Sequence, residues 1–374
     1  MATDSANDLI AQWIRADVRA ASAYHVPDAS GMIKLDAMEN PFGWPAEMIA
    51  AWQARLAEVE FNRYPDPRAR ELVAALRTAM EIPAGAGVLL GNGSDELIQM
   101  IIMAVAAPGR CVLSLEPGFV MYRIISELCG VDYVGVALDE DFALDLDATL
   151  AAIAEHQPAV IFIAWPNNPT GNLFEAEAIE RIIAAAPGLV VVDEAYHVFA
   201  GRTFMPRLPR HPGLLVMRTV SKMGLAGLRL GLLAGDEALI HELDKVRLPY
   251  NINVLTQVTA RFALEHGAVL EEQAATLRAE RARLFDALAR HPELKVFPSD
   301  ANFILFRSPA GTATGIHGAL KEAGILIKNL DGGAPALRDC LRVTVGTREE
   351  NDAFLAALDS ALLAMHSEQE GAGT

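Results

Sequence analysis

Lysine is scarce in this chain, and one lysine stands where it could act as a nucleophile. Lys222 follows an apolar run at 214–219 and precedes a glycine-rich turn at 223–227. A lysine at the carboxyl end of a parallel strand faces the crevice in which α/β proteins bind ligands. Burial there lowers the pKa of the ammonium group, and the neutral amine can form a Schiff base. Taken alone, the same pattern also fits an ordinary surface lysine in a loop.

Two further segments could assist such a nucleophile. Residues 190–192 are all valine, Asp193 follows them, and Tyr196 lies three residues further on. A carboxylate at a strand end can keep a ring nitrogen protonated, and a phenol can donate a hydrogen bond to a ring oxygen. The turn sequence WPNNPTG, 165–171, follows another apolar run and contributes the amide of Asn168. By themselves, these segments are equally an ordinary strand end with a capping acid and a simple turn.

A glycine-rich segment indicates an anion site. The sequence GNGSDELI, residues 91–98, is expected to connect a strand to a helix. Free N–H groups at a helix start, together with the helix dipole, bind phosphate, and Ser94 and Asp95 lie at that point. Alternatively, either side chain is only a helix N-cap. The spacing matches neither the dinucleotide-binding GxGxxG pattern nor the P-loop, which disfavours NAD and ATP sites.

The candidate residues follow predicted strands, so the fold must bring the ends of these strands together at one edge. The pattern of the sequence predicts such a fold. Short apolar runs alternate with helical patterns, at 88–90, 111–115, 131–136, 160–164, 189–192, 214–219 and 230–234. Runs that are apolar at successive positions are typical of strands buried on both faces. The alternation predicts an α/β fold with a largely parallel sheet covered by helices on both faces. Beyond residue 253 a long helical stretch to about residue 290, followed by short strands and helices, predicts a smaller α+β domain.

The composition excludes several classes of function. Against 31 Lys and Arg the chain carries 48 Asp and Glu, a formal net charge of −17, and no basic cluster that could follow a nucleic-acid backbone. Cys111, Cys129 and Cys340 have no metal-ligand or disulfide spacing, so we expect no metal and a reducing compartment. No long apolar stretch and no signal-peptide pattern occur, so we expect a cytoplasmic protein without a membrane span.

Taken together and in this order, the motifs resemble those of a known family. GNGSDELI, NNPTG, VVVDEAY, SKMGLAGLRLG and CLRVTVGT are similar to the motifs of pyridoxal-phosphate (PLP) aminotransferases of fold type I, in the aspartate-aminotransferase-like subgroup. Within that subgroup, KLDAMENP and YPDP resemble the histidinol-phosphate aminotransferases. The resemblance spans the chain from about residue 24 to 348. It implies pyridoxal 5'-phosphate as cofactor and a mostly parallel, seven-stranded sheet with helices on both faces, plus a smaller α+β domain.

The resemblance also implies a role for each motif. Lys222 would form the internal aldimine with the cofactor and later shuttle a proton. Asp193 would pair with the pyridinium nitrogen, while Tyr196 and Asn168 would bind the phenolic oxygen of the ring. Phe119 matches the aromatic residue stacked on the ring, where relatives often carry tyrosine. The cofactor phosphate would be held by Ser94, Asp95, Thr219, Ser221 and Arg229, the last of these one residue closer to the lysine than in several relatives.

Substrate and partner follow from the same resemblance. Arg342 matches the arginine that binds the α-carboxylate of glutamate through a bidentate contact and, in the other half-reaction, the phosphate of histidinol phosphate. Tyr24 and Asn40 match positions that line the substrate pocket. Tyr64 is expected to reach the cofactor phosphate of the neighbouring subunit, which requires a homodimer.

Three parts are expected along the chain. Residues 1–40 would form an N-terminal segment of helix and loop that packs with the small domain and the dimer partner. Residues 41–265 would form the large cofactor-binding domain, and residues 266–374 the small α+β domain. The large domain would therefore interrupt a smaller one built from both chain ends.

The predicted reaction is ping-pong transamination in histidine biosynthesis, between glutamate and 2-oxoglutarate on one side and imidazole acetol phosphate and L-histidinol phosphate on the other. An aromatic amino-acid aminotransferase of broader specificity remains an alternative. A lyase similar to threonine-phosphate decarboxylase is another, since it would keep Lys222, Asp193 and Arg229. A non-catalytic binder with the same fold is a third, and the intact lysine argues against it.

Overall fold

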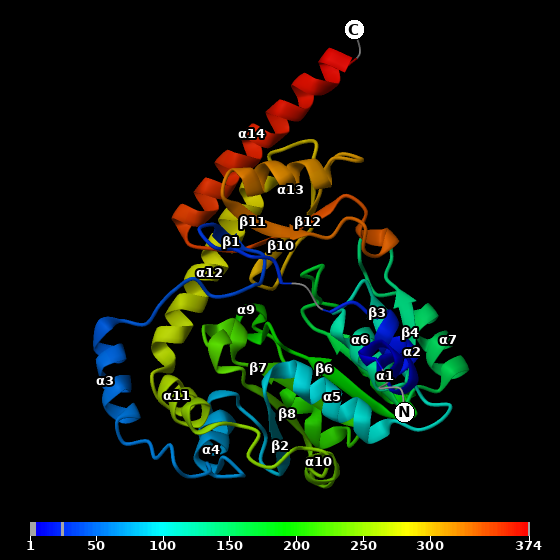
Figure 1. Cartoon of the computed structure of the whole chain (residues 1–374), viewed down its shortest axis with the longest axis vertical. Helices are drawn as coiled ribbons and strands as arrows, with labels where there is room; N and C mark the ends of the chain where they lie inside the picture. Colours follow the sequence, from blue (N-terminus) through cyan, green and yellow to red (C-terminus); the bar gives the residue numbers. More distant parts are fainter. Residues whose placement is uncertain (1–4, 24–25, 373–374) are drawn as a thin grey trace.

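Two β-sheets form the centre of the molecule, one above the other in Figure 1. The computed structural model describes residues 5–23 and 26–372, with side chains up to residue 365. The larger sheet has seven strands in the order β2-β8-β7-β6-β5-β3-β4. Its strands are β2 (Ala86–Gly91), β3 (Cys111–Glu116), β4 (Asp132–Ala137), β5 (Val160–Ala164), β6 (Leu189–Asp193), β7 (Leu214–Thr219) and β8 (Gly231–Asp236).

Strand direction in the larger sheet sets the position of the functional site. β8 runs antiparallel to both neighbours, β2 and β7, and the remaining strands pair in parallel from β7 to β4. All strands except β8 therefore point the same way. Their carboxyl ends meet at one edge, where open α/β sheets bind ligands.

Helices cover both faces of this sheet because its strands are apolar at successive positions. Val160 and Phe162 of β5 pack on one face with α5 (Gly93–Val105), α6 (Met121–Leu128) and α10 (Glu237–Asp244). Ile161 and Ile163 point to the opposite face and pack with α4, α7 and α8. These three helices span Arg70–Ala79, Leu146–His156 and Ala176–Ala185.

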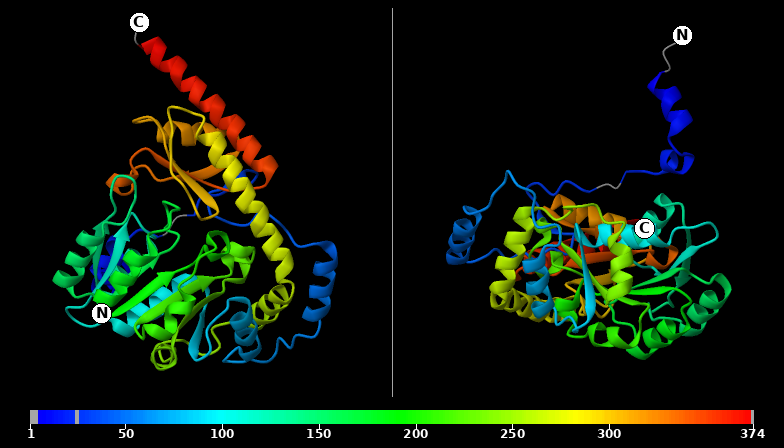
Figure 2. Two further views of the ribbon diagram at one scale, coloured as in Figure 1. Left: turned by 180° about the vertical axis from the view of Figure 1, so that it is seen from behind. Right: turned by 90° about the horizontal axis from the view of Figure 1, so that it is seen from below.

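The smaller sheet joins both ends of the chain. Its order is β1-β11-β12-β10-β9, and β1 near the N-terminus pairs in parallel with β11, with Ile33 opposite Ile325. The strands are β1 (Ile33–Leu35), β9 (Lys295–Val296), β10 (Phe303–Arg307), β11 (Ile325–Asn329) and β12 (Cys340–Thr344). The associated helices are α12 (Gly267–Leu288), α13 (Ala313–Glu322) and α14 (Arg348–Ala372). In Figures 1 and 2, α12 runs from beside the larger sheet up to the smaller one.

Short elements complete the described chain. The helices are α1 (Ala6–Trp13), α2 (Ala16–Ala20), α3 (Ala46–Leu56), α9 (His197–Ala200) and α11 (Val254–Glu265). The 3-10 turns are η1 (Met205–Arg210), η2 (Ser221–Met223), η3 (Ala226–Leu228) and η4 (Pro335–Leu337). In the right-hand view of Figure 2, α1 and α2 stand away from the body of the molecule. No helix among the described residues is long and apolar enough to cross a membrane.

Three local expectations differ from the structure. The expected single helical stretch from 253 to 290 is divided into α11 and α12, which meet at His266 and Gly267. The first forty residues contain strand β1 in addition to helix and loop, and β11 was not predicted. β1 has only three residues, too few for a period-two pattern, and both strands are defined mainly by pairing with distant segments.

Candidate active site

Ten residues expected at the cofactor site line one cavity. It has a volume of about 130 Å³ and lies at the carboxyl ends of β5, β6 and β7, beside the start of α5. The ten are Ser94, Asp95, Phe119, Asn168, Asp193, Tyr196, Thr219, Ser221, Lys222 and Arg229. They come from segments up to 135 positions apart in the chain, from Ser94 to Arg229. The shared direction of the strands brings them to the same edge.

Lys222 lies in η2, shortly after β7, and its side chain is partly buried. Its Nζ donates a hydrogen bond to the carbonyl oxygen of Ala37 at 3.1 Å. Burial, followed by the positive charge of Arg342, lowers the pKa of Lys222 to about 8. A substantial fraction of this amine is therefore neutral near physiological pH, which is the state that attacks a carbonyl carbon.

Asp193 ends β6 and is almost completely buried. Oδ2 accepts a hydrogen bond from the hydroxyl of Tyr122 at 2.7 Å, and Oδ1 accepts one from the backbone N–H of Ala195 at 3.0 Å. Burial raises the pKa of Asp193 to about 6, although both hydrogen bonds act in the opposite direction. A buried carboxylate of this kind is stabilised by a cationic partner in the cavity, such as a protonated ring nitrogen.

Polar groups from the two sheets meet above this carboxylate. Asn168 is buried in the turn after β5, and its Oδ1 accepts a hydrogen bond from Nη1 of Arg342 at 2.5 Å. Arg342 lies on β12 of the smaller sheet and also donates from Nη2 to the carbonyl oxygen of Asp36 at 3.0 Å. Tyr196 is buried, and burial raises the pKa of its phenol. Its hydroxyl therefore stays protonated and can donate a hydrogen bond.

The start of α5 forms a cradle for an anion. Gly93, the first residue of α5, has a φ of +81°, and a Cβ there would lie 2.7 Å from Nη2 of Arg229. The positive φ favours glycine at this position, and the absence of a Cβ lets the guanidinium lie beside the helix start. Nη2 of Arg229 lies 3.6 Å from Oδ2 of Asp95, and the hydroxyls of Thr219 and Ser221 are 2.9 Å apart. Backbone N–H groups, two hydroxyls and one arginine are a donor set that suits a phosphate group.

The remaining expected residues lie elsewhere. Asn40 donates through Nδ2 to Oε1 of Gln273 at 3.0 Å and does not line the cavity. Tyr64 is 80% exposed, does not line the cavity of its own chain, and stacks on Tyr250 with ring centroids 4.5 Å apart. Tyr24 lies outside the described residues.

Several residues at the site were not predicted from the sequence. Met38, Ala164, Pro166 and Ala195 complete the lining of the cavity. They neighbour recognised motifs, so sequence position alone is the signal that could have found them. Tyr122 has no such signal, because its contact with Asp193 joins residues 71 positions apart.

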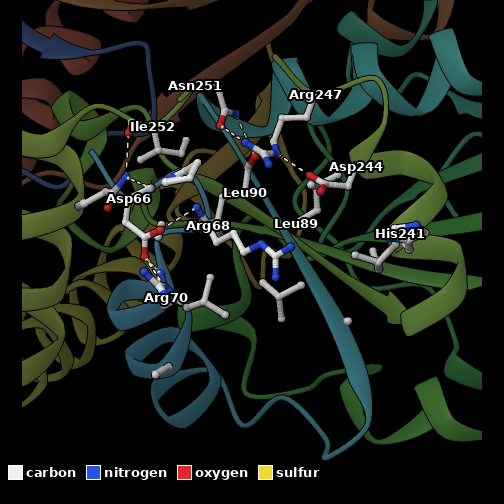
Figure 3. Close-up of a pocket in the computed structure, with 18 of the residues that line it drawn as sticks. Asp66, Arg68, Arg70, Leu89, Leu90, His241, Asp244, Arg247, Asn251 and Ile252 are labelled. Carbon is white, nitrogen blue, oxygen red and sulfur yellow. Dashed lines mark hydrogen bonds and ion pairs between the residues drawn. The ribbon is translucent and has the colours of Figure 1, made fainter. Parts of the chain in front are cut away.

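A larger hollow of about 480 Å³ lies beside β2, α4 and α10 (Figure 3). Four of its charged side chains form two ion pairs. Arg70 contacts Asp66 at 2.9 Å, and Arg247 contacts Asp244 at 2.6 Å. The nucleophilic amine of Lys222 lines the smaller cavity together with Asp193 and Tyr196, whose pKa values are shifted by burial, and we therefore regard the smaller cavity as the candidate active site.

Known proteins resemble this chain along nearly its whole length. Residues 30–358 match the aminotransferase class I and II family. A histidinol-phosphate aminotransferase of Nitrosococcus oceani is 61% identical over 351 residues, which cover 94% of this chain and 98% of the relative. One of Ralstonia nicotianae is 57% identical, with 96% of each chain covered.

A crystal structure supports the same relationship. The histidinol-phosphate aminotransferase of Sinorhizobium meliloti, in complex with pyridoxal-5'-phosphate, has a TM-score of 0.84 and 25% sequence identity, covering 94% of this chain and 98% of that one. The fold predicted from the motifs is thus confirmed, as is the predicted family. The chain belongs to the histidinol-phosphate aminotransferases, within the aminotransferase class I and II family.

Proposed function

We propose that this protein is a PLP-dependent aminotransferase that exchanges an amino group between glutamate and imidazole acetol phosphate, giving 2-oxoglutarate and L-histidinol phosphate for histidine biosynthesis. The observation that carries the proposal is one cavity that contains Lys222, Asp193 and the anion cradle at Gly93. The names of relatives that are 57–61% identical support the choice of substrate.

The residues of the cavity suit the cofactor. Asp193 would hold the pyridine nitrogen, Tyr196 and Asn168 the phenolic oxygen, and Phe119 one face of the ring. Ser94, Asp95, Thr219, Ser221 and Arg229 would hold the phosphate. When bound, the cofactor supplies an electron sink for the negative charge that develops at the substrate Cα.

Lys222 carries the proton chemistry. Its neutral Nζ can take a proton from the substrate Cα and hold it, because burial keeps the pKa of the amine near 8. Tyr196 stays protonated at its phenolic oxygen, since burial raises the pKa of that group. Burial of Asp193 and Tyr196 also excludes water from this side of the cavity, which strengthens the electrostatic contacts within it.

Arg342 provides the anion-binding group for the substrate. Its guanidinium is buried, and Nη1 already holds an oxygen acceptor, the side chain of Asn168. Nη2 of Arg342 and Nζ of Lys222 donate to the carbonyl oxygens of the neighbouring residues Asp36 and Ala37, so the two groups lie close enough to serve one substrate. A carboxylate or a phosphate would be bound by the guanidinium through paired hydrogen bonds, which suits glutamate and histidinol phosphate alike.

A homodimer with a shared active site is part of this proposal. Tyr64 lies away from the cavity of its own chain and is exposed, which supports a role in the neighbouring subunit's site. One lysine and one cofactor would serve both half-reactions, which gives ping-pong kinetics. We propose a large domain of residues 41–265 and a small one of residues 266–374, and a cytoplasmic location supported by the free thiols of Cys111, Cys129 and Cys340.

A panel of amino acceptors tests this function. Purified enzyme with PLP and glutamate is expected to convert imidazole acetol phosphate faster, by kcat/KM, than aromatic keto acids. A preference for aromatic keto acids would overturn the proposed substrate but leave transamination as the reaction type. Release of CO₂ from O-phosphothreonine, with no 2-oxoglutarate formed from glutamate, would replace the transaminase with a lyase.

A further inference from the structure

Tyr122 contacts a residue of the candidate active site, Asp193, without lining the cavity itself. It lies on α6 and is 1% exposed, and it does not line the cavity that holds Asp193 and Lys222. Its hydroxyl donates to Oδ2 of Asp193 at 2.7 Å. The ring is fixed independently, since it stacks on Phe162 at 4.7 Å between centroids and meets the edge of Phe119 at 5.5 Å.

The hydroxyl of Tyr122 is important for the Asp193 carboxylate, because this carboxylate accepts few other hydrogen bonds. The carboxylate receives one hydrogen bond at Oδ2, from Tyr122, and one at Oδ1, from the backbone N–H of Ala195. Asp95 and Glu194 both face Asp193 with negative charge, which disfavours ionisation of its carboxyl group. Removal of one of two donors from a buried carboxylate therefore leaves an oxygen without compensation for its lost hydration.

The geometry also fixes orientation. With one donor on each carboxylate oxygen, Asp193 cannot turn about its terminal bond without breaking both hydrogen bonds. Each oxygen keeps a further lone pair for a partner in the cavity. The phenol of Tyr122 stays protonated, because burial raises its pKa well above the ordinary value.

We propose that Tyr122 is a positioning residue whose hydroxyl keeps Asp193 ionised and oriented toward the pyridine nitrogen of the cofactor. This inference rests on the proposed function for the identity of the cofactor. It concerns the hydroxyl and not the ring, because Phe162 and Phe119 hold the ring by packing alone. Through Asp193, the hydroxyl would favour the protonated form of the ring nitrogen, which is the form that accepts electrons.

The main test is Tyr122→Phe, which removes the hydroxyl and keeps the ring. The variant is loaded with PLP labelled with ¹⁵N, and the NMR signal of the ring nitrogen is compared with that of the wild type. The expected result is a shift toward the unprotonated form. PLP is expected to bind about 10-fold more weakly, with a Kd about 10-fold higher, as for a lost hydrogen bond to a charged group.

Tyr133→Phe is the matched control. Tyr133 is a partly buried tyrosine of the same domain, and its hydroxyl faces Ser114 and Glu116 instead of Asp193. This control should keep the ¹⁵N signal and the PLP affinity of the wild type. Equal changes in both variants, or no change in Tyr122→Phe, would overturn the inference.

A second substitution covers the case in which Tyr122→Phe does not fold. Fluorinated tyrosine at position 122 keeps the ring and the hydroxyl but makes the phenol a stronger donor, so the ring nitrogen should be at least as protonated as in the wild type. A shift toward the unprotonated form would contradict the inference. If wild-type protein binds no PLP, the proposed function itself fails. If it binds PLP and transaminates while Tyr122→Phe leaves the ¹⁵N signal unmoved, only the role of Tyr122 fails.

Discussion

Nη1 of Arg342 donates a hydrogen bond to Oδ1 of Asn168 at 2.5 Å, and this contact joins the two sheets at the candidate active site. Arg342 belongs to β12 of the smaller sheet, whereas Asn168 follows β5 of the larger one. The two residues are 174 positions apart in the chain. A substrate anion that binds Arg342 must therefore share its guanidinium with Asn168 or displace it, which couples substrate binding to the contact between the sheets.

Replacement of Arg342 by methionine tests its role as the anion-binding group. We expect kcat/KM to fall for both glutamate and histidinol phosphate, because each would lose a charge-assisted contact in a buried site. Truncation of such a partner costs about 2–5 kcal/mol, or roughly 30- to several thousand-fold. Steady-state kinetics with each substrate measures the loss.

Arg338→Met is the control for loss of one arginine from the same part of the chain. Its side chain is not part of the cavity or of the contacts at Asn168. It should leave both kinetic constants close to those of the wild type. A loss confined to one of the two substrates in Arg342→Met would show that the other anion binds elsewhere.

The lowered pKa of Lys222 predicts a specific pH dependence. Burial depresses this pKa to about 8, so the neutral fraction of the amine rises with pH and is nearly complete above pH 9. The rate at which apo-protein captures PLP, followed by absorbance, should therefore rise through pH 8 and level off above about pH 9. An unperturbed lysine, with a pKa of about 10.4, would give a rate that still rises beyond pH 10.

Two variants identify the amine that is responsible. Lys222→Ala should abolish the covalent attachment of PLP that borohydride reduction makes permanent. Lys34→Gln should retain it, because Lys34 is engaged with Glu39 at 2.6 Å and does not line the cavity. Continued rise of the wild-type rate above pH 10, or capture by Lys222→Ala, would contradict the assignment.

The strands of the large sheet could be predicted because burial on both faces requires runs of apolar residues, which are visible in the local sequence. β5 and β7 are buried along their full lengths; β5 is apolar at every position and β7 is apolar through Met217. Their strand ends led directly to Asn168 and Lys222, since α/β sheets place ligands at that edge. Local sequence thus sufficed wherever the side chain lies next to the strand that positions it.

Contacts between distant segments could not be predicted in the same way. The donor to Asp193 is Tyr122, and the acceptor for Arg342 is Asn168, and neither pairing follows from spacing in the chain. Strand β1 is stabilised by pairing with β11, almost 300 positions away, and has no periodic pattern of its own. Such contacts arise from the topology, which is known only after the chain is folded.

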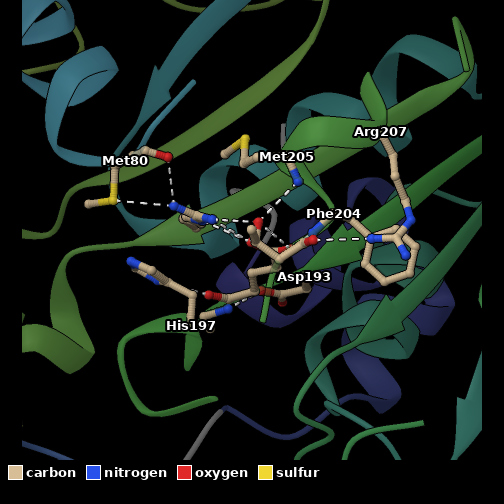
Figure 4. A network of polar contacts seen from close by, with 10 residues as sticks. Met80, Asp193, His197, Phe204, Met205 and Arg207 are labelled. Atoms are coloured by element: carbon tan, nitrogen blue, oxygen red, sulfur yellow. Dashed lines mark hydrogen bonds and ion pairs between the residues drawn. The ribbon is translucent and has the colours of Figure 1, made fainter. Parts of the chain in front are cut away.

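A buried ion pair beneath the site is expected to govern stability (Figure 4). Glu194, next to Asp193, contacts Arg218 at 2.8 Å, and both side chains are at most 5% exposed. Thr203 also donates to Glu194. Arg218→Met would leave the carboxylate without its cationic partner. We expect a loss of about 3–5 kcal/mol in the free energy of unfolding, measured by denaturant titration at pH 7.

A double variant separates the effect of the lost charge pairing from the effect of the lost packing. Addition of Glu194→Gln to Arg218→Met removes the unpaired charge, so much of the stability should return. The sign with pH follows from burial, which already raises the pKa of Glu194 against the opposing charge of Arg218 and would raise it further in Arg218→Met. The folded single variant then binds a proton more readily than the unfolded chain, so its deficit should shrink as pH falls toward 5. Equal instability of the single and double variants would indicate that packing dominates.

The proposed sharing of Tyr64 between subunits can be tested with hybrid dimers. Tyr64 is exposed and stacks on Tyr250, so Tyr64→Phe should keep the stacking and lose only the hydroxyl. This variant is expected to bind PLP about 10-fold more weakly, as for a hydrogen bond to a charged group. Lys222→Ala is inactive but has an intact Tyr64. Activity is measured at a PLP concentration that saturates only sites with both groups.

Mixing the two variants distinguishes the two arrangements of Tyr64. If Tyr64 serves the neighbouring subunit, each hybrid dimer contains one site with Lys222 from one chain and Tyr64 from the other, and this site is fully intact. Random exchange would place about a quarter of all sites in that state, so activity should rise above that of either variant alone. If Tyr64 served its own subunit, every site with Lys222 would lack the tyrosine hydroxyl, and mixing would add nothing. Exchange itself is verified by separating the two chains with a charge tag, so that an unchanged activity in confirmed hybrids rejects the shared site.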